Sequence, residues 1–416
     1  MIFGFIPPEI WSNLVLAFKY IYIGMPVWLP VTFLILLFDS WIHYKRLKFW
    51  QKEGSILLEI KLPREITKSP AAMEVVLEAF NQGSGEGTWW ARIIEGKTRS
   101  WFSLELVSMG GNIKFFIWTK PRHKNVIESA IYSQYPEIEI YEVEDYTKPF
   151  YYDPQKNNVY GIEFALAKPD PYPIKTYVEY GLEKDPKEEL KVDPMTPVIE
   201  FLGSIPEGHN IWFQIIIRAH AANRFWGVFG KEDDSWEKDM EKEKEKIIEK
   251  LKTGEFGGFP RILSKGETEV LAALERSVSK HPFDVGIRAI YIADKDKFNP
   301  ANIGGILGAF KQYGSNNLNG FKPSGWFDIF DYPWQKWWNR QEKLKPLVLQ
   351  EYKMRRFFYS PLKNKRIWWE NIYSKPFVLN TEELATIYHF PGAVAATPTL
   401  EKIPSLKSKA PPNLPI

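Results

Sequence analysis

YIYIGMPVWLPVTFLILLFDSW, residues 20–41, contains a single formal charge, Asp39. At about 1.5 Å per residue, a helix over this stretch would measure about 33 Å, enough to cross a hydrocarbon core of about 30 Å. Pro26 and Pro30 disfavour a soluble helix, whereas membrane helices tolerate proline. A buried core helix is the alternative, and a signal peptide does not fit because no small-residue cleavage site follows. The stretch therefore predicts a single membrane-spanning helix.

Basic residues gather directly after this stretch, at Lys45, Arg46, Lys48 and Lys52. The other flank offers only Lys19 against Glu9. Lysine and arginine stay preferentially on the cytoplasmic side of a span. We therefore predict that residues 1–52 form an anchor with a basic collar in the inner (plasma) membrane, and that the rest of the chain is cytoplasmic.

Composition narrows the function classes. The net charge of +3 does not demand nucleic acid as a partner, and the absence of cysteine excludes disulfides, thiolate zinc sites and cysteine nucleophiles. The 17 tryptophans fit contact with a membrane interface, but also a large core or a partner surface.

Residues 53–147 carry the pattern of one ferredoxin-like α+β domain. Alternating apolar residues predict strands over 55–62, 102–106, 113–117 and 138–143. Helices are expected after Pro70 and Pro121, and Gly110-Gly111 suits a hairpin turn. The resulting order β-α-β-β-α-β is that of the ferredoxin-like fold. The glycines of residues 83–87 follow a helix, and we interpret them as a flexible turn and not as a phosphate loop.

Residues 148–396 carry the same pattern a second time, with an insertion. Strands are predicted over 159–167, 211–217 and 285–291, and helices after Pro194 and Pro300. Two helices, the first densely charged, are inserted at about 230–282. The last strand is predicted at either Lys353–Tyr359 or Pro376–Leu379. Residues 397–416 form a tail rich in proline and lysine.

Two aromatic stretches are candidate interaction surfaces. The first is a membrane or partner patch, with a loop filling core gaps as its alternative: Trp326, Phe327, Trp334, Trp337 and Trp338. The second mixes cations and aromatics, which suits single-stranded nucleic acid or anionic lipid but also an ordinary solvated surface: Lys353, Arg355, Arg356, Lys365, Arg366, Trp368 and Trp369.

Motifs that would indicate catalysis do not occur in the sequence. There is no G-x-x-x-x-G-K-[ST] phosphate loop and no G-x-S-x-G nucleophile elbow, and the six histidines are scattered. We therefore expect a protein that is not an enzyme and that holds no cofactor or metal. An enzyme site assembled from dispersed residues is the weaker alternative.

Several stretches resemble a known family. Glu382–Gly392, EELATIYHFPG, with Pro398–Pro415, resembles the segment before the nucleotide-binding core of bacterial membrane-anchored ATPases. Those ATPases are similar to type IV secretion coupling proteins and other DNA translocases. Leu62–Phe80 and His209–Ala221 resemble the uncharacterised membrane-proximal domain of that family. The chain ends where the motor domain would begin, so no ATPase residue can be carried over.

The resemblance implies a non-catalytic membrane component of a secretion or DNA-translocation machine, acting as a platform for a cytoplasmic motor ATPase. It makes Leu384, Ile387, His389 and Phe390 candidates for motor docking, although Leu384, Ile387 and Phe390 are also expected to pack in the domain. Expected partners are the membrane, the motor and further copies of the chain. A membrane-tethered binder of nucleic acid or anionic lipid, using residues 353–369, is the rival interpretation.

Overall fold

The computed structural model describes residues 8–63, 66, 68–83, 88–182, 193–220, 236–252, 264–325, 340–359, 374–392 and 402–403. The chain divides into two compact units, each discontinuous in sequence. The helical unit comprises Met1–Glu53 and Gly85–Thr98, and the sheet unit comprises Gly54–Ser84 and Arg99–Ile416. The structure is mixed α+β: the first unit holds a long apolar helix, and the second an antiparallel sheet.

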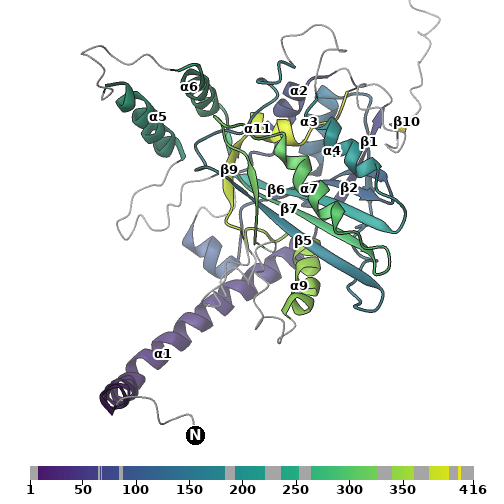
Figure 1. Ribbon diagram of the computed structural model, residues 1–416. Coiled ribbons are helices and arrows are strands. Elements are labelled where there is room, and N and C mark those ends of the chain that lie inside the picture. The colour runs from purple at the N-terminus through teal and green to yellow at the C-terminus, as the bar shows by residue number, and fades with distance from the viewer. Residues whose placement is uncertain are drawn as a thin grey trace, which may run out of the picture. The chain divides into compact units, whose positions relative to one another are not determined.

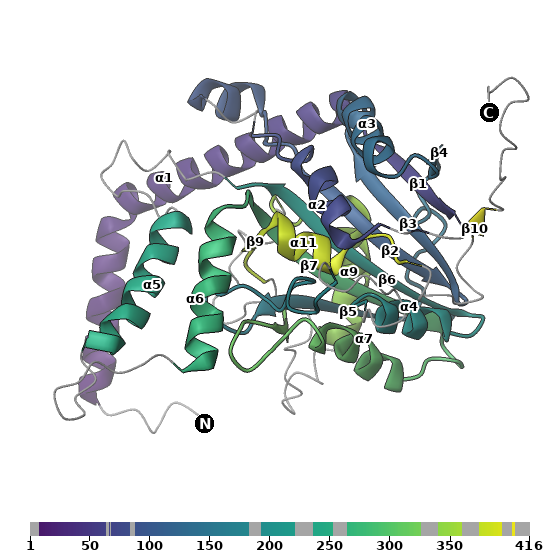
Figure 2. The ribbon, with the colours of Figure 1, turned by 90° about the horizontal axis from the view of Figure 1, so that it is seen from above.

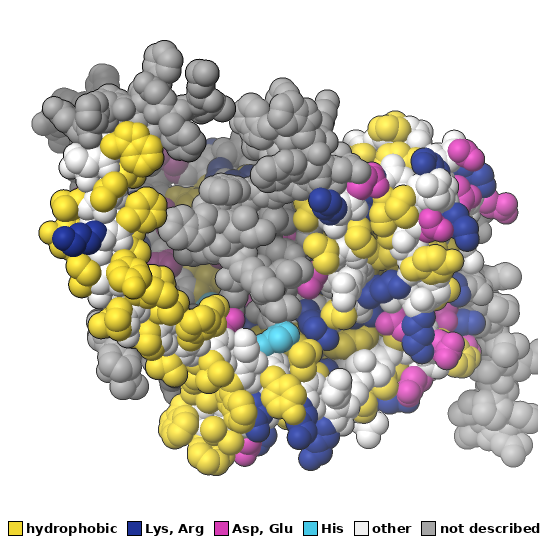
Figure 3. Space-filling model, turned by 90° about the horizontal axis from the view of Figure 1, so that it is seen from below, with side chains coloured by type: hydrophobic (Ala, Val, Ile, Leu, Met, Phe, Trp, Pro, Cys, Tyr) yellow, Lys and Arg dark blue, Asp and Glu magenta, His cyan; other side chains and the backbone are white. Residues whose placement is uncertain are grey.

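The helical unit is built on α1 (Pro8–Glu53), a helix of 46 residues. It is long and apolar enough to cross a membrane. Large apolar side chains are exposed along it, among them Phe18 at 68% and Val27 at 72%, and Figure 3 shows hydrophobic side chains following the helix. The indole N–H of Trp28 donates to the carbonyl oxygen of Ile21 at 2.9 Å. The polar atom of this side chain is therefore satisfied within the helix, as hydrocarbon surroundings require.

The first half of the sheet unit follows the predicted element order. Its elements are β1 (Ile56–Pro63), α2 (Pro70–Glu78), β2 (Phe102–Met109), β3 (Asn112–Thr119), η3 (Pro121–His123), α3 (Lys124–Gln134) and β4 (Glu139–Val143). All strand pairs in this half are antiparallel, and the strand order is β4-β1-β3-β2. The hairpin between β2 and β3 turns at Gly110 and Gly111, whose φ angles of 58° and 86° suit glycine.

The second half repeats that order with two helices inserted between its second and third strands: β5 (Asn157–Leu166), α4 (Thr196–Gly203), β6 (His209–Ala219), α5 (Trp236–Lys252), α6 (Lys265–Val278), β7 (Pro282–Asp294), α7 (Ala301–Lys311) and β8 (Phe321–Ser324). Its strands are also antiparallel, in the order β8-β5-β7-β6. The inserted helices have a small core of their own, formed by Trp236 and Met240 of α5 with Val270 and Leu274 of α6.

The two halves share one sheet because β2 pairs with β6. The pairing is antiparallel and runs from Phe102 opposite Ile217 to Met109 opposite Asn210. We call this pairing the seam. Two further strands extend the sheet: β9 (Phe377–Asn380) pairs with the start of β7, and β10 (Lys402–Ile403) pairs parallel to the end of β1. The described strands leave no sheet edge between the halves, so neither half has to protect one there.

The two faces of the sheet are covered differently. Figures 1 and 2 show α2, α3, α4, α7 and α11 (Thr381–Ile387) over one face, and Figure 1 shows α9 (Arg340–Met354) on the other. The first face carries the main hydrophobic core, to which the strands contribute every second residue, for example Leu104, Phe213 and Ile287. The predicted inward residues of α2, including Met73 and Leu77, lie in this core.

On the other face of the sheet, α9 packs closely against β5 at a glycine. A Cβ built on Gly161 of β5 would lie 2.3 Å from Cγ1 of Val348 in α9. Atoms that are not bonded do not approach so closely in a packed core, so α9 occupies its observed position only because position 161 has no side chain.

Three predictions differ from the structure. The last strand of the second half is β8, and residues 353–359 hold the end of α9 and turns instead of a strand. Phe377–Asn380 is a strand as the alternative predicted, but it pairs with β7 and not with β5. The tail contributes β10, because the backbone of β1 beyond β4 is free to pair at Leu62 and Pro63.

We predict that Gly161→Ala lowers the free energy of unfolding by about 1–3 kcal/mol, as overpacking does. Val348→Ala removes the clashing methyl groups, so the double variant G161A/V348A should be more stable than the sum of the two single effects predicts. Urea unfolding of the detergent-solubilised chain, followed by near-UV circular dichroism, measures both. Gly304→Ala in α7 is the matched control, because its Cβ would meet nothing within 4 Å. Strict additivity of the G161A and V348A effects would contradict the proposed contact.

Candidate functional site

A row of buried polar side chains crosses the face of the sheet under α9. Four polar side chains stand directly opposite one another on consecutive strands: Glu105 on β2, Gln214 on β6, Arg288 on β7 and Glu163 on β5. We call them the polar row. All four are buried. Gln214 Nε2 donates to Glu105 Oε1 at 2.8 Å, and Arg288 Nε donates to Gln214 Oε1 at 2.6 Å.

Arg355 completes the polar row from the segment after α9. Its Nε donates to Glu105 Oε1 at 2.7 Å and its Nη1 to Asp145 Oδ2 at 2.6 Å. Only 1% of the Arg355 side chain and none of the Glu105 side chain is exposed. Tyr146 also donates to Glu105, at 2.8 Å, and burial raises the pKa of the Tyr146 hydroxyl well above its ordinary value. The guanidinium is therefore committed to neutralising interior carboxylates.

Arg355, one of the residues predicted for a nucleic-acid or lipid surface, is therefore interior. The Nζ of Lys353 donates to the carbonyl oxygen of Phe150, and Arg356 is partly buried. The remaining residues of that run lie outside the described residues: Lys365, Arg366, Trp368 and Trp369. The aromatic patch Trp326, Phe327, Trp334, Trp337 and Trp338 also lies outside them.

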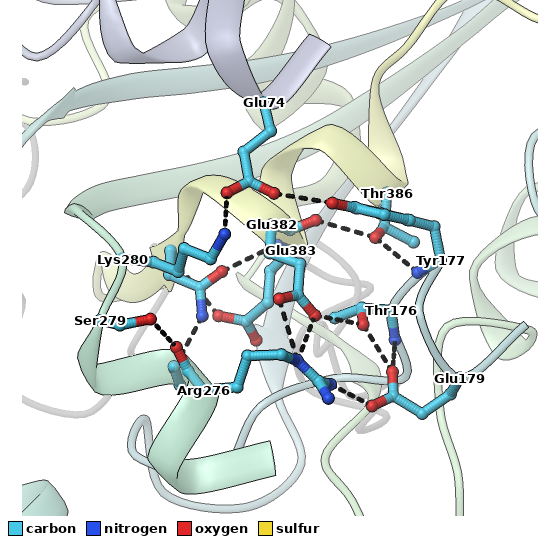
Figure 4. Close-up of polar contacts among 12 residues, drawn as sticks. Glu74, Thr176, Tyr177, Glu179, Arg276, Ser279, Lys280, Glu382, Glu383 and Thr386 are labelled. Carbon is cyan, nitrogen blue, oxygen red and sulfur yellow. Dashed lines mark hydrogen bonds and ion pairs between the residues drawn. The ribbon is translucent and has the colours of Figure 1, made fainter. Parts of the chain in front are cut away.

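A second polar network surrounds α11, the helix that carries most of the EELATIYHFPG stretch (Figure 4). Asn380 caps the helix: its Oδ1 accepts from the N–H of Glu383 at 2.8 Å, and Glu383 Oε2 accepts from the N–H of Asn380 at 2.9 Å. Glu383 Oε1 accepts from the N–H of Ile174 at 2.8 Å. This reciprocal pattern is a capping box.

Glu382 and Glu74 link α11 to the neighbouring elements. Glu382 accepts from Thr176 Oγ1 at 2.5 Å and from Arg276 Nε of α6 at 3.0 Å. Glu74 of α2 accepts from the hydroxyl of Tyr177 at 2.8 Å and pairs with Lys280. Figure 4 shows these side chains pointing toward one another from α2, α6 and α11. The network was not predicted from the sequence, although the Asn-x-x-Glu spacing at 380–383 is a helix-start signal.

The four candidate docking residues belong to this packed region. Leu384, Ile387, His389 and Phe390 are all buried. His389 Nδ1 lies 2.8 Å from the carbonyl oxygen of Ala385, and its Nε2 lies 3.0 Å from Asp193 Oδ1. The predicted packing of Leu384, Ile387 and Phe390 is confirmed. Docking through these four side chains is not possible in this conformation, because they face the interior.

Among the described residues, no cluster of His, Asp or Glu has the arrangement of a metal site. A hollow of about 120 Å³ lies near the end of β1, lined in part by Ile66, Tyr135 and Ile138. Pockets for small molecules commonly measure about 300–1,000 Å³. The described carboxylates of the two networks act as hydrogen-bond acceptors inside the fold.

The basic collar lies on the last turns of α1, beside residues 88–98 of the same unit. Lys48 and Lys52 are exposed, and Lys45 and Arg46 are partly buried. Lys45 Nζ lies 4.6 Å from the centre of the Trp41 ring. The indole N–H of Trp41 donates to the carbonyl oxygen of Ile93 at 3.2 Å, and that of Trp50 to Thr98 Oγ1 at 3.0 Å.

A protein-family model matches most of the chain. It describes a domain of unknown function, DUF8128, and the match covers residues 50–402. No curated protein matches the chain.

We predict that Arg355→Ala lowers the free energy of unfolding by about 3–5 kcal/mol, because it leaves the Glu105 carboxylate buried without its cation. Glu105→Gln should recover part of that loss in the double variant E105Q/R355A. Lys343→Ala, at an exposed position of α9, should change stability by less than about 0.5 kcal/mol. Urea unfolding measures all three. A loss at R355A no larger than at K343A would refute the role assigned to Arg355.

Glu383 gives the protein a pH-dependent stability. Burial raises the pKa of Glu383 from 4.5 to about 8, although the N–H groups of Asn380 and Ile174 oppose the shift. Between these two values the folded state binds more protons than the unfolded chain, so this group's contribution to the free energy of unfolding falls as pH rises, by at most about 1.4 kcal/mol per pH unit.

We therefore expect Glu383→Gln to flatten the decline in stability between about pH 5 and about pH 8. At about pH 5 the variant should be less stable than the unaltered chain, because the glutamine amide nitrogen cannot accept a hydrogen bond from a backbone N–H. Urea unfolding at a series of pH values gives the free energy of unfolding against pH. The slope of that curve is measured separately from the loss caused by the missing hydrogen bond. Glu245→Gln, at an exposed position of α5, is the control. Equal slopes for E383Q and the unaltered chain would contradict the prediction.

Proposed function

The chain belongs to the DUF8128 family, and from this premise we propose that it is a non-catalytic scaffold protein anchored in the plasma membrane by α1. The observation that carries this proposal is the exposed apolar surface of α1, including Phe18, Val27 and Leu37. Leaving such side chains in water costs about 1.5–3 kcal/mol each relative to burial. A bilayer removes that cost along the whole helix at once.

The orientation in this proposal follows from the basic collar. Lys45, Arg46, Lys48 and Lys52 all lie within the last turns of α1. Basic residues near the end of a span are retained on the cytoplasmic side. The sheet unit is then cytoplasmic.

The non-catalytic part of the proposal is supported by the use of charge in the sheet unit. Glu105, Arg288, Arg355 and Glu383 are buried in hydrogen-bonded networks. In this conformation the hydrogen bonds of these groups go to other groups of the protein interior. We propose that these groups fix the fold, and that the outer surface of the fold acts as the platform.

We propose a cytoplasmic motor ATPase of a secretion or DNA-translocation machine as the partner. The resemblance of Glu382–Gly392 to the segment before the motor of such ATPases supports this choice. That segment is folded into the sheet unit through α11, so in the proposal the residues beyond it meet the motor. The buried Leu384, Ile387, His389 and Phe390 then support the docking segment from inside.

We also infer that each half of the sheet unit is a ferredoxin-like unit. The strand orders β4-β1-β3-β2 and β8-β5-β7-β6 support this inference, together with a helix in each of the two crossovers of each half. The fold alone implies no particular activity.

The test is capture of a motor ATPase of a secretion or DNA-translocation machine from the same genome, with both proteins produced in bacterial membranes. We predict that the full chain resists carbonate extraction and co-purifies the ATPase. A chain ending at Pro398 should also stay in the membrane but lose the ATPase, and a chain starting at Gly54 should leave the membrane. ATPase recovery from the truncated chain at the full-length yield would contradict the platform assignment, as would release of the full chain by carbonate. Salt-sensitive binding of single-stranded DNA by the full chain would favour the nucleic-acid alternative.

A further inference from the structure

The helical unit contains a second aromatic element besides α1. Residues 88–98 begin with Thr88, Trp89 and Trp90 and continue through the π-helical turn η2 (Ala91–Glu95) to Thr98. Thr88 starts the turn: its Oγ1 accepts from the N–H of Ala91 at 3.2 Å. Trp89 is 59% exposed and Trp90 is 53% exposed, and their rings form an edge-to-face pair with centroids 5.7 Å apart. Two adjacent tryptophans that expose more than half of their surface need a partner that suits both apolar and polar contact.

The contacts of this segment fix its level along α1. Ile93 accepts a hydrogen bond from Trp41, and Thr98 accepts one from Trp50. Between them, a Cβ on Gly96 would lie 2.4 Å from the carbonyl carbon and oxygen of Lys45. Residues 88–98 therefore lie against the α1 backbone at Lys45. The close approach is possible because Gly96 has no side chain.

The order of these contacts gives the direction of the segment. Ile93, Gly96 and Thr98 meet Trp41, Lys45 and Trp50 in the same sequence, so the segment runs parallel to α1. Trp89 and Trp90 precede Ile93 and accordingly lie toward the apolar end of that contact, at about the level of Trp41. Figure 2 shows this short helical segment beside α1.

The charge of the same region fits a lipid headgroup layer. Residues 41–53 and 88–98 together hold six basic residues against two acidic ones. Lys48 and Lys52 are exposed on the side of Trp41 away from the apolar stretch. Tryptophan prefers the membrane–water interface, and lysine and arginine just beyond it attract anionic headgroups.

We propose that Trp89 and Trp90 enter the headgroup layer of an anionic phospholipid bilayer and form, with Trp41, an aromatic clamp that sets the depth of α1. This inference rests on the proposed membrane anchoring by α1. It gives residues 88–98 a binding role: they are a second contact with lipid, held by packing against the helix that enters the bilayer.

The absence of cysteine makes the test direct, because one introduced cysteine is a unique labelling site. Three single-cysteine variants of the full chain carry an NBD fluorophore: Trp90→Cys, Leu34→Cys within the apolar stretch of α1, and Val126→Cys on α3. All three positions are exposed. Each variant is reconstituted in vesicles of phosphatidylcholine and phosphatidylglycerol, with spin labels placed near the headgroup or deep in the acyl chain.

We expect the label at position 90 to be quenched at least about twofold more by the shallow spin label than by the deep one. The label at position 34 should respond more to the deep spin label, and the label at position 126 to neither. Quenching at 34 with none at 90 would overturn the clamp and leave the anchor intact. No quenching at 34 would overturn the proposed anchoring, and the clamp with it.

A second comparison tests the clamp without labelling it. The fluorophore is placed at Lys48→Cys, and the tryptophans are replaced in the double variant Trp89→Ser/Trp90→Ser. The ratio of quenching by the shallow spin label to quenching by the deep one should then change, because α1 loses the contact that fixes its depth. The matched control is Val126→Ser/Tyr132→Ser, which replaces two exposed apolar residues of α3. A ratio at position 48 that is the same in both double variants would overturn the role of the tryptophans in setting depth.

Discussion

The polar row across the seam is the constraint on which the sheet unit depends. Two strands of alternating apolar residues, such as β2 and β6, would bury their apolar faces equally well after a slip of two residues, because side chains alternate with a period of two. Glu105, Gln214 and Arg288 remove that freedom, since each is buried and each finds its partner only in the observed register. A slipped pairing would leave a buried charge without a counter-charge, which costs several kcal/mol. The apolar face thus drives the pairing, and the polar face selects which pairing forms.

A polar row beneath a covering helix has consequences for that helix. The hydrogen bonds of the polar row can select a register only where water is excluded, because water would otherwise replace the missing partners. The helix α9 and Arg355 cover the row and exclude water from it. Sealing requires close approach, which the missing side chain at Gly161 permits. Arg355 itself has a φ of 52°, a conformation that residues other than glycine rarely adopt, and this delivers its guanidinium to Glu105. One arginine therefore joins the covering segment to the seam.

The sequence predicted what depends on local pattern and missed what depends on distant partners. Alternation identified the long strands, and proline positions identified helix starts at Pro70 and Pro121. The strand β8 was missed because its four residues, FKPS, are too few to show a period and include proline. From the sequence alone Arg355 looks like a surface cation, because its acidic partners, Glu105 and Asp145, are more than 200 residues away in sequence. The sequence did not single out Trp89 and Trp90, because they are far from Trp41 along the chain. Only the packing of residues 88–98 on α1 brings them to the same position along the helix as Trp41.

The covalent connections between the two units show where a force on the proposed membrane anchor would reach the sheet. The chain passes between the units three times, after Glu53, after Ser84 and after Thr98. After the last passage only three residues separate Thr98 from Phe102, the first residue of β2. A force on residues 88–98 thus enters the sheet at the seam strand. This strand is paired along its length on both sides, with β3 and with β6, and its polar row holds the register. Strands in the interior of a sheet are among the last parts of a protein to open, so this attachment resists displacement better than an attachment to an edge strand would.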